Sequence, residues 1–465
     1  MKIVIVGGGT AGWMAALTFA RAQPGKHKVV LVESDSIPIV GAGEGSTRLL
    51  HDFLYNVWFD TGIDQKQFFE HANATHKSGI KHVNWTGDGS SYFAPLDGSS
   101  TNGLVPDVEF CLQLMHDPDH LHRASQLGRN WEKGIWGSGS YHFDAFKVGD
   151  YFSKIAIESG VEKIVNTVWG VNVDQETNTI KRLVCENGEE IEGDFFVDCT
   201  GFKRTLCGAM DMKWKSYKEN LPVDSAIAFR MPIEPNYERL TTATAMNNGW
   251  CWKIPTAERY GCGYVYSSDF CTKEQAHEEI RQLYGDVKIQ REFQFNSGRS
   301  EELWKGNCLA LGLAAAFSEP LEATSIHCTI MQTVVFALEY LKDDSKDTIL
   351  PQRIEKYNSH MAKLYDDMRD FLVVHYMGGR TDTEFWRHIT AGNTLTPGAE
   401  YVLDVAKNQV PSALTIDHYF GCAGSALYNW VLAGIGKIDS DTARKTLERY
   451  GLQDLDHGNF TKNHI

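Results

Sequence analysis

The chain lacks the signatures of several protein classes. Its 465 residues include ten cysteines, but none form a CxxC pair or stand at zinc-binding distance from histidines. This spacing argues against a disulfide framework and a zinc centre. No apolar run reaches the roughly 18 residues that a membrane helix needs. Proline is sparse, at 13 residues, and there is no internal repeat or low-complexity tract. We therefore expect reduced thiols, a cytoplasmic location, no bound metal and no membrane partner.

Basic residues are also outnumbered by acidic residues. Lysine and arginine total 45 against 60 aspartates and glutamates, which gives a formal net charge of −15. An acidic chain does not hold polyanions non-specifically, so we expect no nucleic-acid partner. The apolar fraction of 42% and the charged fraction of 23% are close to globular averages. A chain of this length and composition can bury a substantial core.

The N-terminus carries a nucleotide-binding pattern. Lys2–Val6 is a short β-branched run typical of a buried parallel strand. The run GGGTAG at 7–12 follows it and matches G-x-G-x-x-G, and a helix is expected to continue to about Ala22. A second strand at His27–Val32 ends in Glu33. Strand, glycine turn, helix, strand and acid together predict the βαβ unit that binds dinucleotides.

Each part of this pattern has a physical role. Gly7 permits the tight turn, Gly9 lets a pyrophosphate approach the backbone at the helix N-terminus, and Gly12 allows close packing of helix on strand. Glu33 is expected to accept hydrogen bonds from a ribose diol. The motif does not separate NAD from FAD. The chain has no second G-x-G-x-x-G, so a separate NAD(P)H site is not indicated.

The remaining sequence predicts a discontinuous α/β architecture. We expect further strands at 163–173, 179–186, 195–199, 226–231, 251–254, 261–267 and 307–313, and helices at 148–159, 325–341 and 351–376. The predicted fold is an FAD-binding Rossmann-like core of the flavin monooxygenase type, with a second mixed sheet. This core spans 1–345, mainly 1–50, 150–205 and 300–345, with substrate-region segments between these pieces. Residues 346–465 are expected to form a mostly helical part packed on it. A discontinuous plan suits FAD enzymes better than NAD dehydrogenases.

Four motifs carry a family resemblance. They are GGGTAGWMAA at 7–16, W-x-W-x-I-P at 250–255, the segment around Lys77 and FSEPLEATSI at 317–326. Supporting stretches stand at 40–47, 141–152, 198–202 and 368–376. Together they resemble the flavin-dependent halogenases of the tryptophan halogenase type, over about residues 1–390.

The resemblance implies an activity and its co-substrates. FAD would act as FADH2, supplied by a separate flavin reductase, with O2 and a halide ion as co-substrates. Hypohalous acid made at the flavin would pass to Lys77, which would place an electrophilic halogen beside a small aromatic substrate. Lys77 would either hydrogen-bond the acid or become a haloamine, and both routes stay open. Glu322 would polarise the halogenating species or take the proton from the ring. A homodimer is compatible with the resemblance.

The resemblance also assigns binding residues. The halide would meet the backbone amides of Thr324 and Ser325, which could instead be an N-cap pair of the following helix. Trp250 and Trp252 alternate on a predicted strand and face one side, where they would wall the flavin off from the arene, although core packing is the simpler interpretation. Cofactor positions beyond Gly7, Gly9, Gly12 and Glu33 are Thr10, Ala11, Ser34, Val40, Ala42, Gly45, Val168, Leu313 and Ile326.

Two departures from the tryptophan-specific members bear on the substrate. The chain is shorter after DTEFW at 382–386, and the stretch Ser91–Pro95 lacks the histidine of those members. An indole- or phenol-like arene is therefore expected, rather than free tryptophan. Two alternatives are kept: a flavin-dependent aromatic hydroxylase and a non-catalytic FAD-binding protein. Lys77, Glu322 and the tryptophan pair argue against the first, and the presence of both proposed catalytic residues argues against the second.

Overall fold

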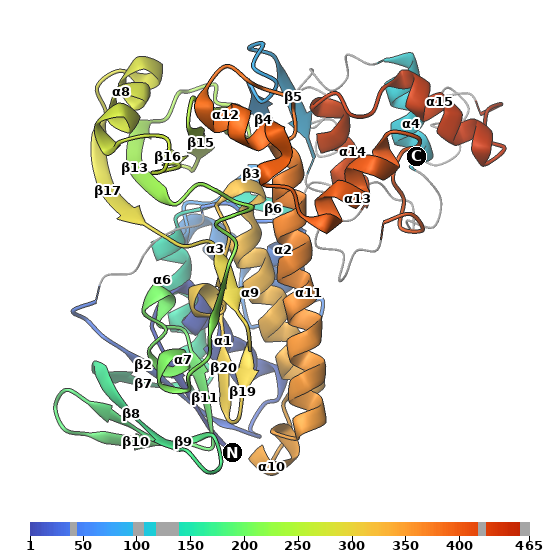
Figure 1. Ribbon diagram of the computed structural model, residues 1–465. Coiled ribbons are helices and arrows are strands. Elements are labelled where there is room, and N and C mark those ends of the chain that lie inside the picture. The colour runs from blue at the N-terminus through green and yellow to red at the C-terminus, as the bar shows by residue number, and fades with distance from the viewer. Residues whose placement is uncertain (38–43, 96–106, 118–138, 417–424, 456–465) are drawn as a thin grey trace.

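A parallel sheet forms the base of the molecule. The computed structural model describes residues 1–37, 44–95, 107–117, 139–416 and 425–455 (Figure 1). The sheet has the order β19-β20-β11-β1-β2-β7. Its strands are β1 (Lys2–Val6), β2 (Lys28–Glu33), β7 (Glu162–Val165), β11 (Phe195–Asp198), β19 (Trp304–Lys305) and β20 (Cys308–Ala310). All pairs are parallel except β19 with β20. Buried β-branched and aromatic residues fill β1 and β11, as strands covered on both faces require.

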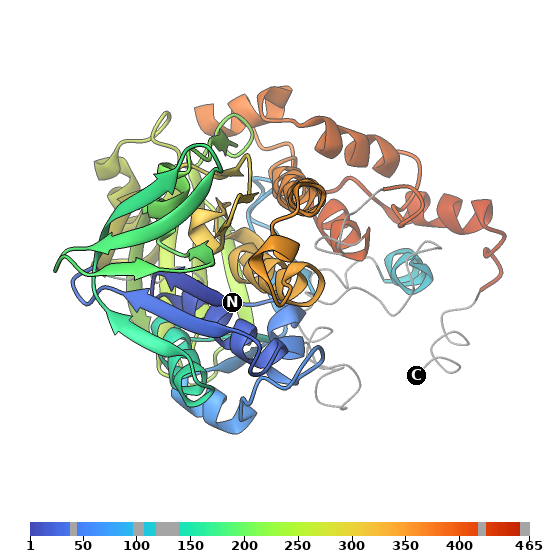
Figure 2. The same cartoon turned by 90° about the horizontal axis from the view of Figure 1, so that it is seen from below.

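The glycine turn leads from β1 into helix α1 (Thr10–Ala22), which packs against α6 (Ala145–Glu158). Beside the base lies an antiparallel sheet of β8 (Val168–Asp174), β9 (Thr179–Cys185) and β10 (Glu190–Glu192) (Figure 2). The single strand predicted over 163–173 is wrong. The chain leaves the parallel sheet after β7 and enters this second sheet at β8. Between them, the Asn166 amide still donates to the Glu33 carbonyl of β2 over 2.9 Å, its side chain accepts a hydrogen bond of 2.9 Å from the Thr167 amide, and the ladder goes no further.

A second, seven-stranded sheet lies at the other end of the molecule, as expected. Its order is β17-β13-β16-β15-β14-β4-β5. The strands are β4 (Gly79–Val83), β5 (Ser91–Ala94), β13 (Ser225–Pro232), β14 (Leu240–Ala245), β15 (Gly249–Pro255), β16 (Arg259–Tyr266) and β17 (Lys288–Gln294). The sheet is mixed because β4 runs parallel to β14, while the other pairs are antiparallel. Trp250 and Trp252 lie on β15, near its middle.

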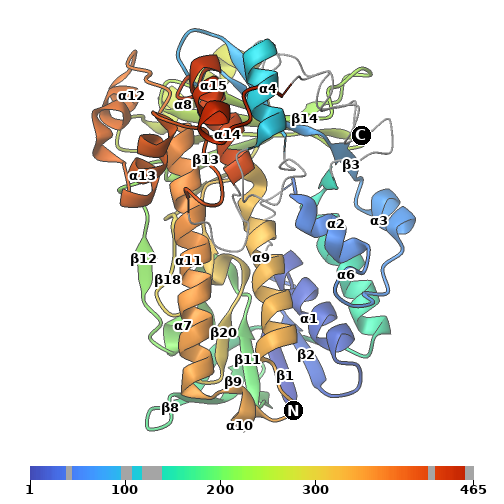
Figure 3. The ribbon, with the colours of Figure 1, turned by 90° about the vertical axis from the view of Figure 1, so that its right-hand side faces the viewer.

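Two helices join the sheets. Helix α9 (Thr324–Val335) continues as a π-helical turn over Phe336–Tyr340, and the 25-residue α11 (Pro351–His375) runs beside it (Figure 3). The stretch Leu321–Tyr340 is long and apolar enough to cross a membrane by composition alone. Most of its apolar window, 72%, is buried inside the protein, as in the core helix of a folded domain. After α11 the described residues form the helices α12 (Glu384–His388), α13 (Pro397–Ala406), α14 (Ser425–Gly434) and α15 (Ser440–Arg449).

Shorter elements connect these layers. They are α2 (Arg48–Leu54), α3 (Gln65–His71), α4 (Val108–His116), α7 (Thr205–Ala209), α8 (Lys273–Tyr284), α10 (Ser345–Thr348), the strand pair β3 (Thr75–Lys77) and β6 (Ser140–His142), and a small sheet of β12 (Trp214–Ser216), β18 (Gly298–Ser300) and β21 (Ala316–Phe317). The pair β3–β6 matters most, because it holds Lys77 opposite Ser140 between the two large sheets.

The close approach of α1 to the turn gives a stability test. A Cβ at Gly12 would lie 1.9 Å from the Gly7 carbonyl oxygen, so Gly12→Ala must push the helix away from the strand. We expect a loss of about 1–3 kcal/mol and a lower melting temperature. Gly208→Ala is the matched control, because that glycine lies in α7 with open space around it, and it should be neutral or stabilising. Equal melting temperatures for Gly12→Ala and the native chain would contradict the packing argument.

Candidate active site

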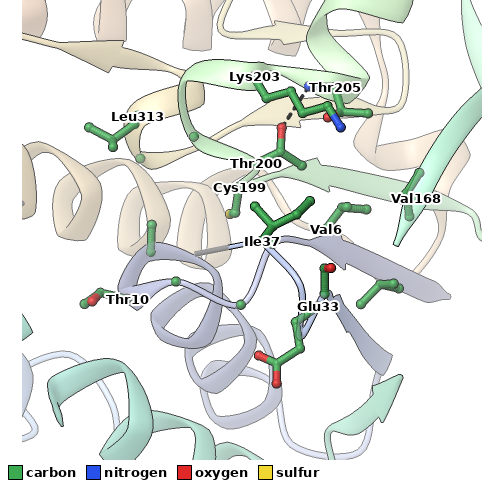
Figure 4. Close-up of a pocket in the computed structure, with 18 of the residues that line it drawn as sticks. Val6, Thr10, Glu33, Ile37, Val168, Cys199, Thr200, Lys203, Thr205 and Leu313 are labelled. Carbon is green, nitrogen blue, oxygen red and sulfur yellow. Dashed lines mark hydrogen bonds between the residues drawn. The ribbon is translucent and has the colours of Figure 1, made fainter. Parts of the chain in front are cut away.

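A cavity of about 430 Å³ opens at the carboxyl ends of β1 and β2 (Figure 4). In open α/β sheets this edge is where ligands bind. Several residues predicted to hold a dinucleotide line it: Gly7, Gly9, Thr10, Ala11, Glu33, Ser34, Val168, Leu313 and Ile326. Gly12 lies behind the turn in the helix packing. Val40 and Ala42 fall outside the described residues. The glycine turn, the two strand ends and the α9 start thus surround one space.

The backbone around this cavity suits a phosphate. Helix α1 begins after Gly9, which has an extended conformation and no side-chain cap, so the first-turn amides are not satisfied by a capping side chain. Gly7 has φ of +115°, and a Cβ there would lie 2.2 Å from the Cys199 carbonyl oxygen. Only glycine fits at this position. Uncapped amides at a helix N-terminus next to a glycine turn are an anion site, so the residues present fit a dinucleotide.

The Glu33 carboxylate contacts two side chains of the protein. Its carboxylate lies 2.5 Å from the Lys163 ammonium and accepts a hydrogen bond of 3.1 Å from the Trp13 indole. In Figure 4 the carboxylate is turned away from Ile37 and toward α1. Each carboxylate oxygen has a second lone pair, so Glu33 can still accept a bond from a ribose, shared with these two partners.

A second cavity of about 310 Å³ adjoins the first, and Ser325 and Ile326 line both. It brings together Lys77 from β3, the two tryptophans of β15 and the segment before α9. Its lining includes the remaining predicted site residues, namely Gly45, Lys77, Trp250, Trp252, Glu322, Thr324 and Ser325. These residues are separated by up to 280 positions in sequence, yet they face one space.

Lys77 is buried, with 1% of its surface exposed. Its ammonium donates to the Ser46 carbonyl over 3.5 Å. Burial lowers the pKa of Lys77 to about 8, although the nearby Glu322 carboxylate acts to raise it. A lysine whose pKa is so low has an appreciable neutral fraction near physiological pH, and a neutral amine is a nucleophile.

Glu322 occupies a strained position. Its φ is +67° and that of Ala323 is +56°, so two successive non-glycine residues are left-handed. Such residues cost about 1–3 kcal/mol each and cluster at functional sites. Burial acts to raise the pKa of the Glu322 carboxyl, but the hydrogen bond with His375 and the nearby His82 ring outweigh it and hold the pKa well below its usual range. The strained turn thus places an ionised carboxylate against the second cavity.

The same turn starts helix α9. The N-cap is Ala323, in the left-handed region, and no side chain caps the helix. Thr324 and Ser325 are therefore the first two helical residues, and the interpretation that they are an N-cap pair is wrong. Their amides belong to the first turn, where a helix N-terminus attracts anions.

The two tryptophans differ in their surroundings. Trp250 is buried and its indole N–H donates to Glu319 over 3.3 Å, while Trp252 is half-buried beside Gly263. Their ring centroids are 6.2 Å apart. The Tyr376 hydroxyl also lies 2.8 Å from both oxygens of Glu319. Burial raises the pKa of Glu319 to about 8, so this carboxyl is largely neutral at pH 7 and fixes one edge of Trp250.

Sequence reasoning did not single out Glu319, His82 or His375. Glu319 and His375 stand inside the stretches 317–326 and 368–376 that carry the resemblance, and His82 stands five residues after Lys77. A histidine on a strand and another at the end of a long helix give no sign that they meet. Only the approach of the C-terminal end of α11 to β4 brings their ring centroids to 5.3 Å from one another.

Comparisons with known proteins agree with this geometry. The sequence pattern of the tryptophan halogenase family matches residues 2–446. The 7-chloro-L-tryptophan 6-halogenase KtzR of Kutzneria sp. (strain 744) is 31% identical over 94% of this chain and 90% of that protein. Tryptophan 7-halogenase RebH of Lentzea aerocolonigenes is 32% identical over 83% of this chain and 78% of its own.

Solved structures show the same relationship. The tryptophan 6-halogenase SttH of Streptomyces toxytricini has a TM-score of 0.84 and 29% identity, covering 100% of this chain and 97% of that one. The flavin-dependent halogenase Xcc4156 of Xanthomonas campestris has a TM-score of 0.83 and 28% identity, with 100% and 98% coverage. The match extends over both sheets and the C-terminal helices. The chain therefore belongs to the tryptophan halogenase family of flavin-dependent halogenases.

Proposed function

We propose that the protein is an FADH2- and O2-dependent halogenase that passes hypohalous acid to Lys77 for electrophilic halogenation of an electron-rich arene. One observation carries the proposal. Lys77, Glu322 and the first amides of α9 line a single cavity that adjoins the nucleotide cavity through Ser325 and Ile326. When bound, reduced FAD supplies the electrons with which O2 and halide give hypohalous acid. The residues that would hold it are those of the first cavity.

The residues of the second cavity have separate proposed roles. The amides of Thr324 and Ser325 would hold the halide, and Trp250 with Trp252 would keep the arene from the flavin. The lowered pKa of Lys77 supports the haloamine route, because the neutral amine can take the halogen from hypohalous acid and release water. Glu322, held as a carboxylate, would stabilise the cationic ring and accept its proton.

The substrate proposal rests on the stretch around Tyr92. This residue lies in the stretch Ser91–Pro95, in which tryptophan-specific members carry a histidine. The ring centroids of Tyr92 and His82 are 4.6 Å apart and the rings stack. It is buried against α14, where a Cβ on Gly434 would lie 2.2 Å from the ring. The absence of a histidine from Ser91–Pro95 supports an indole- or phenol-like arene rather than free tryptophan. We further propose a cytoplasmic enzyme, served by a separate flavin reductase.

The direct test is product mass spectrometry. Reactions would contain FAD, NADH, a flavin reductase and chloride, bromide or iodide, with indoles, phenols or free tryptophan as the arene. We expect halogenated indole or phenol, and no product when the reductase is omitted. Hydroxylated product without halogen would favour the aromatic hydroxylase, and preferential halogenation of free tryptophan would overturn the substrate proposal.

Lys77→Ala should abolish arene halogenation and leave flavin reoxidation by O2 largely intact, because Lys77 lies in the second cavity and not in the first. Both rates would be measured in the same reactions. Lys81→Ala is the matched control, because Lys81 lies on the next strand, pairs with Glu238 and does not line the cavity. Wild-type halogenation by Lys77→Ala would mean that free hypohalous acid does the work.

The pKa of Lys77 gives a pH test of the haloamine route. With a pKa of about 8, the neutral fraction rises from roughly one tenth at pH 7 to nine tenths at pH 9. The single-turnover rate of arene halogenation, measured where flavin oxidation is not limiting, should rise about ninefold over this range. A rate that falls as pH rises through 8 would point instead to the ammonium as a hydrogen-bond donor to hypohalous acid.

FAD affinity tests the first cavity. Glu33→Ala removes the proposed ribose acceptor and should weaken FAD binding about 10- to 100-fold, as expected for a hydrogen bond to a charged group. Glu162→Ala is the control, because this neighbouring acid pairs with Lys28 outside the cavity. Fluorescence titration of the apoprotein would measure both. Identical affinities for both variants would show that Glu33 does not contact the cofactor.

A further inference from the structure

Two fully buried histidines lie behind Glu322. Nε2 of His375, on α11, is 3.0 Å from Glu322 Oε1, and Nε2 of His82, on β4, is 3.4 Å from the same oxygen. Both imidazoles have no exposed surface. Both histidines therefore contact the same carboxylate oxygen, Oε1.

The second nitrogen of His375 fixes its tautomer. Nδ1 lies 2.9 Å from the Phe371 carbonyl oxygen, one helical turn earlier. A carbonyl oxygen can only accept, so Nδ1 must carry a proton. The opposite nitrogen, Nε2, faces Glu322. If the carboxyl is ionised it can only accept, so Nε2 must carry a proton too, and His375 is then an imidazolium.

Glu319 provides an internal comparison three residues away. It is as buried as Glu322, but its partners are the neutral donors Tyr376 and Trp250. Burial raises the pKa of Glu319 to about 8, whereas the histidines hold the pKa of Glu322 well below its usual range. The two carboxyls share one loop and both are buried. What separates them is a partner that can carry positive charge.

We infer that His375 is a positioning residue: it shares one proton with Glu322 Oε1 and so keeps the carboxylate ionised in a buried site. The inference rests on the function proposed above, in which Glu322 takes the ring proton. In that step the carbon–hydrogen electron pair returns to the ring as the aromatic system re-forms, and the proton moves to Oε2. The proton shared with Oε1 stays in place. Release of the new proton to solvent resets the pair.

Other titratable groups face the pair from the neighbouring strands. His82 lies on β4, Tyr92 on β5, His142 on β6 and Lys77 on β3. Burial lowers the pKa of His82 to about 4 and that of His142 well below its usual value, and it raises that of Tyr92, so these three stay neutral near pH 7. Lys77 and the nearby Glu319 have pKa values of about 8. Lys77 and Glu319 titrate in both the variant and the native enzyme. The ratio of the variant's rate to the native rate at each pH therefore cancels the contributions that are equal in both.

The test is His375→Gln, which keeps an N–H donor near Oε1 but removes the positive charge. If Glu322 then titrates near 8, as Glu319 does, only about one tenth is ionised at pH 7. The single-turnover arene step should be about tenfold slower than native at pH 7 and within about twofold of it at pH 9. Flavin reoxidation should be unchanged, which checks the fold. His360→Gln, on the same helix and away from the site, should match the native enzyme throughout.

Infrared difference spectra against Glu322→Gln give a readout without turnover. A protonated-carboxyl band assigned to residue 322 should be present in His375→Gln at pH 7 and absent in the native protein. A variant-to-native rate ratio that is equal at every pH, or no such band, would overturn the inference and leave His375 a packing residue.

A double variant separates this inference from the proposed function. In the Glu322→Gln background, His375→Gln should cost little more and should show no pH-dependent ratio. Native arene rates in Glu322→Gln alone would refute the role of Glu322 itself. A slow Glu322→Gln with a pH-independent His375→Gln would refute only the role of His375. Loss of native activity on EDTA treatment, restored by zinc, would overturn the shared proton in favour of a bound cation.

Discussion

An ionised carboxylate that is almost completely buried is the constraint on which the site depends. Burying a charge is costly unless hydrogen bonds and an opposite charge compensate. At Glu322 the compensation comes from α11 and β4, elements that belong to different layers. The long helix, the seven-stranded sheet and the strained turn before α9 must therefore all be in place before this carboxyl can hold its charge. Lys77 depends on the same arrangement, because burial lowers its pKa while the Glu322 carboxylate raises it.

The fold places the two cavities side by side and keeps them separate. The parallel sheet ends at a cavity built from glycine turns and helix amides, which suits a phosphate-bearing cofactor. The mixed sheet borders a mostly apolar cavity whose lining also includes Lys77, Glu322 and the two tryptophans. Ser325 and Ile326 border both, so the start of α9 is the shared wall. In the proposed function a small halogenating species would cross this boundary, whereas Trp250, whose indole N–H donates to Glu319, would stop an arene.

Much of the fold could be read from local sequence. The βαβ unit, the strand with the tryptophan pair and α11 follow from hydrophobic period, glycine turns and a proline at the helix start. The break between β7 and β8 could not, because it depends on which sheet accepts the strand that follows Thr167. The residues facing the second cavity were predicted from a family likeness. His82 and His375 were missed because their meeting depends on tertiary packing, and the engagement of Glu33 by Lys163 and Trp13 was missed for the same reason.

The central claim is that halogen reaches the arene by way of Lys77. Peptide mass spectrometry after one turnover with bromide, without arene and without a thiol quench, tests it most directly. The account predicts a bromine atom on Lys77 and on no peptide of Lys77→Ala. It also predicts that adding arene to the modified enzyme, after free hypobromous acid has been scavenged, yields brominated product. An unmodified lysine, with all bromination lost to the scavenger, would contradict it.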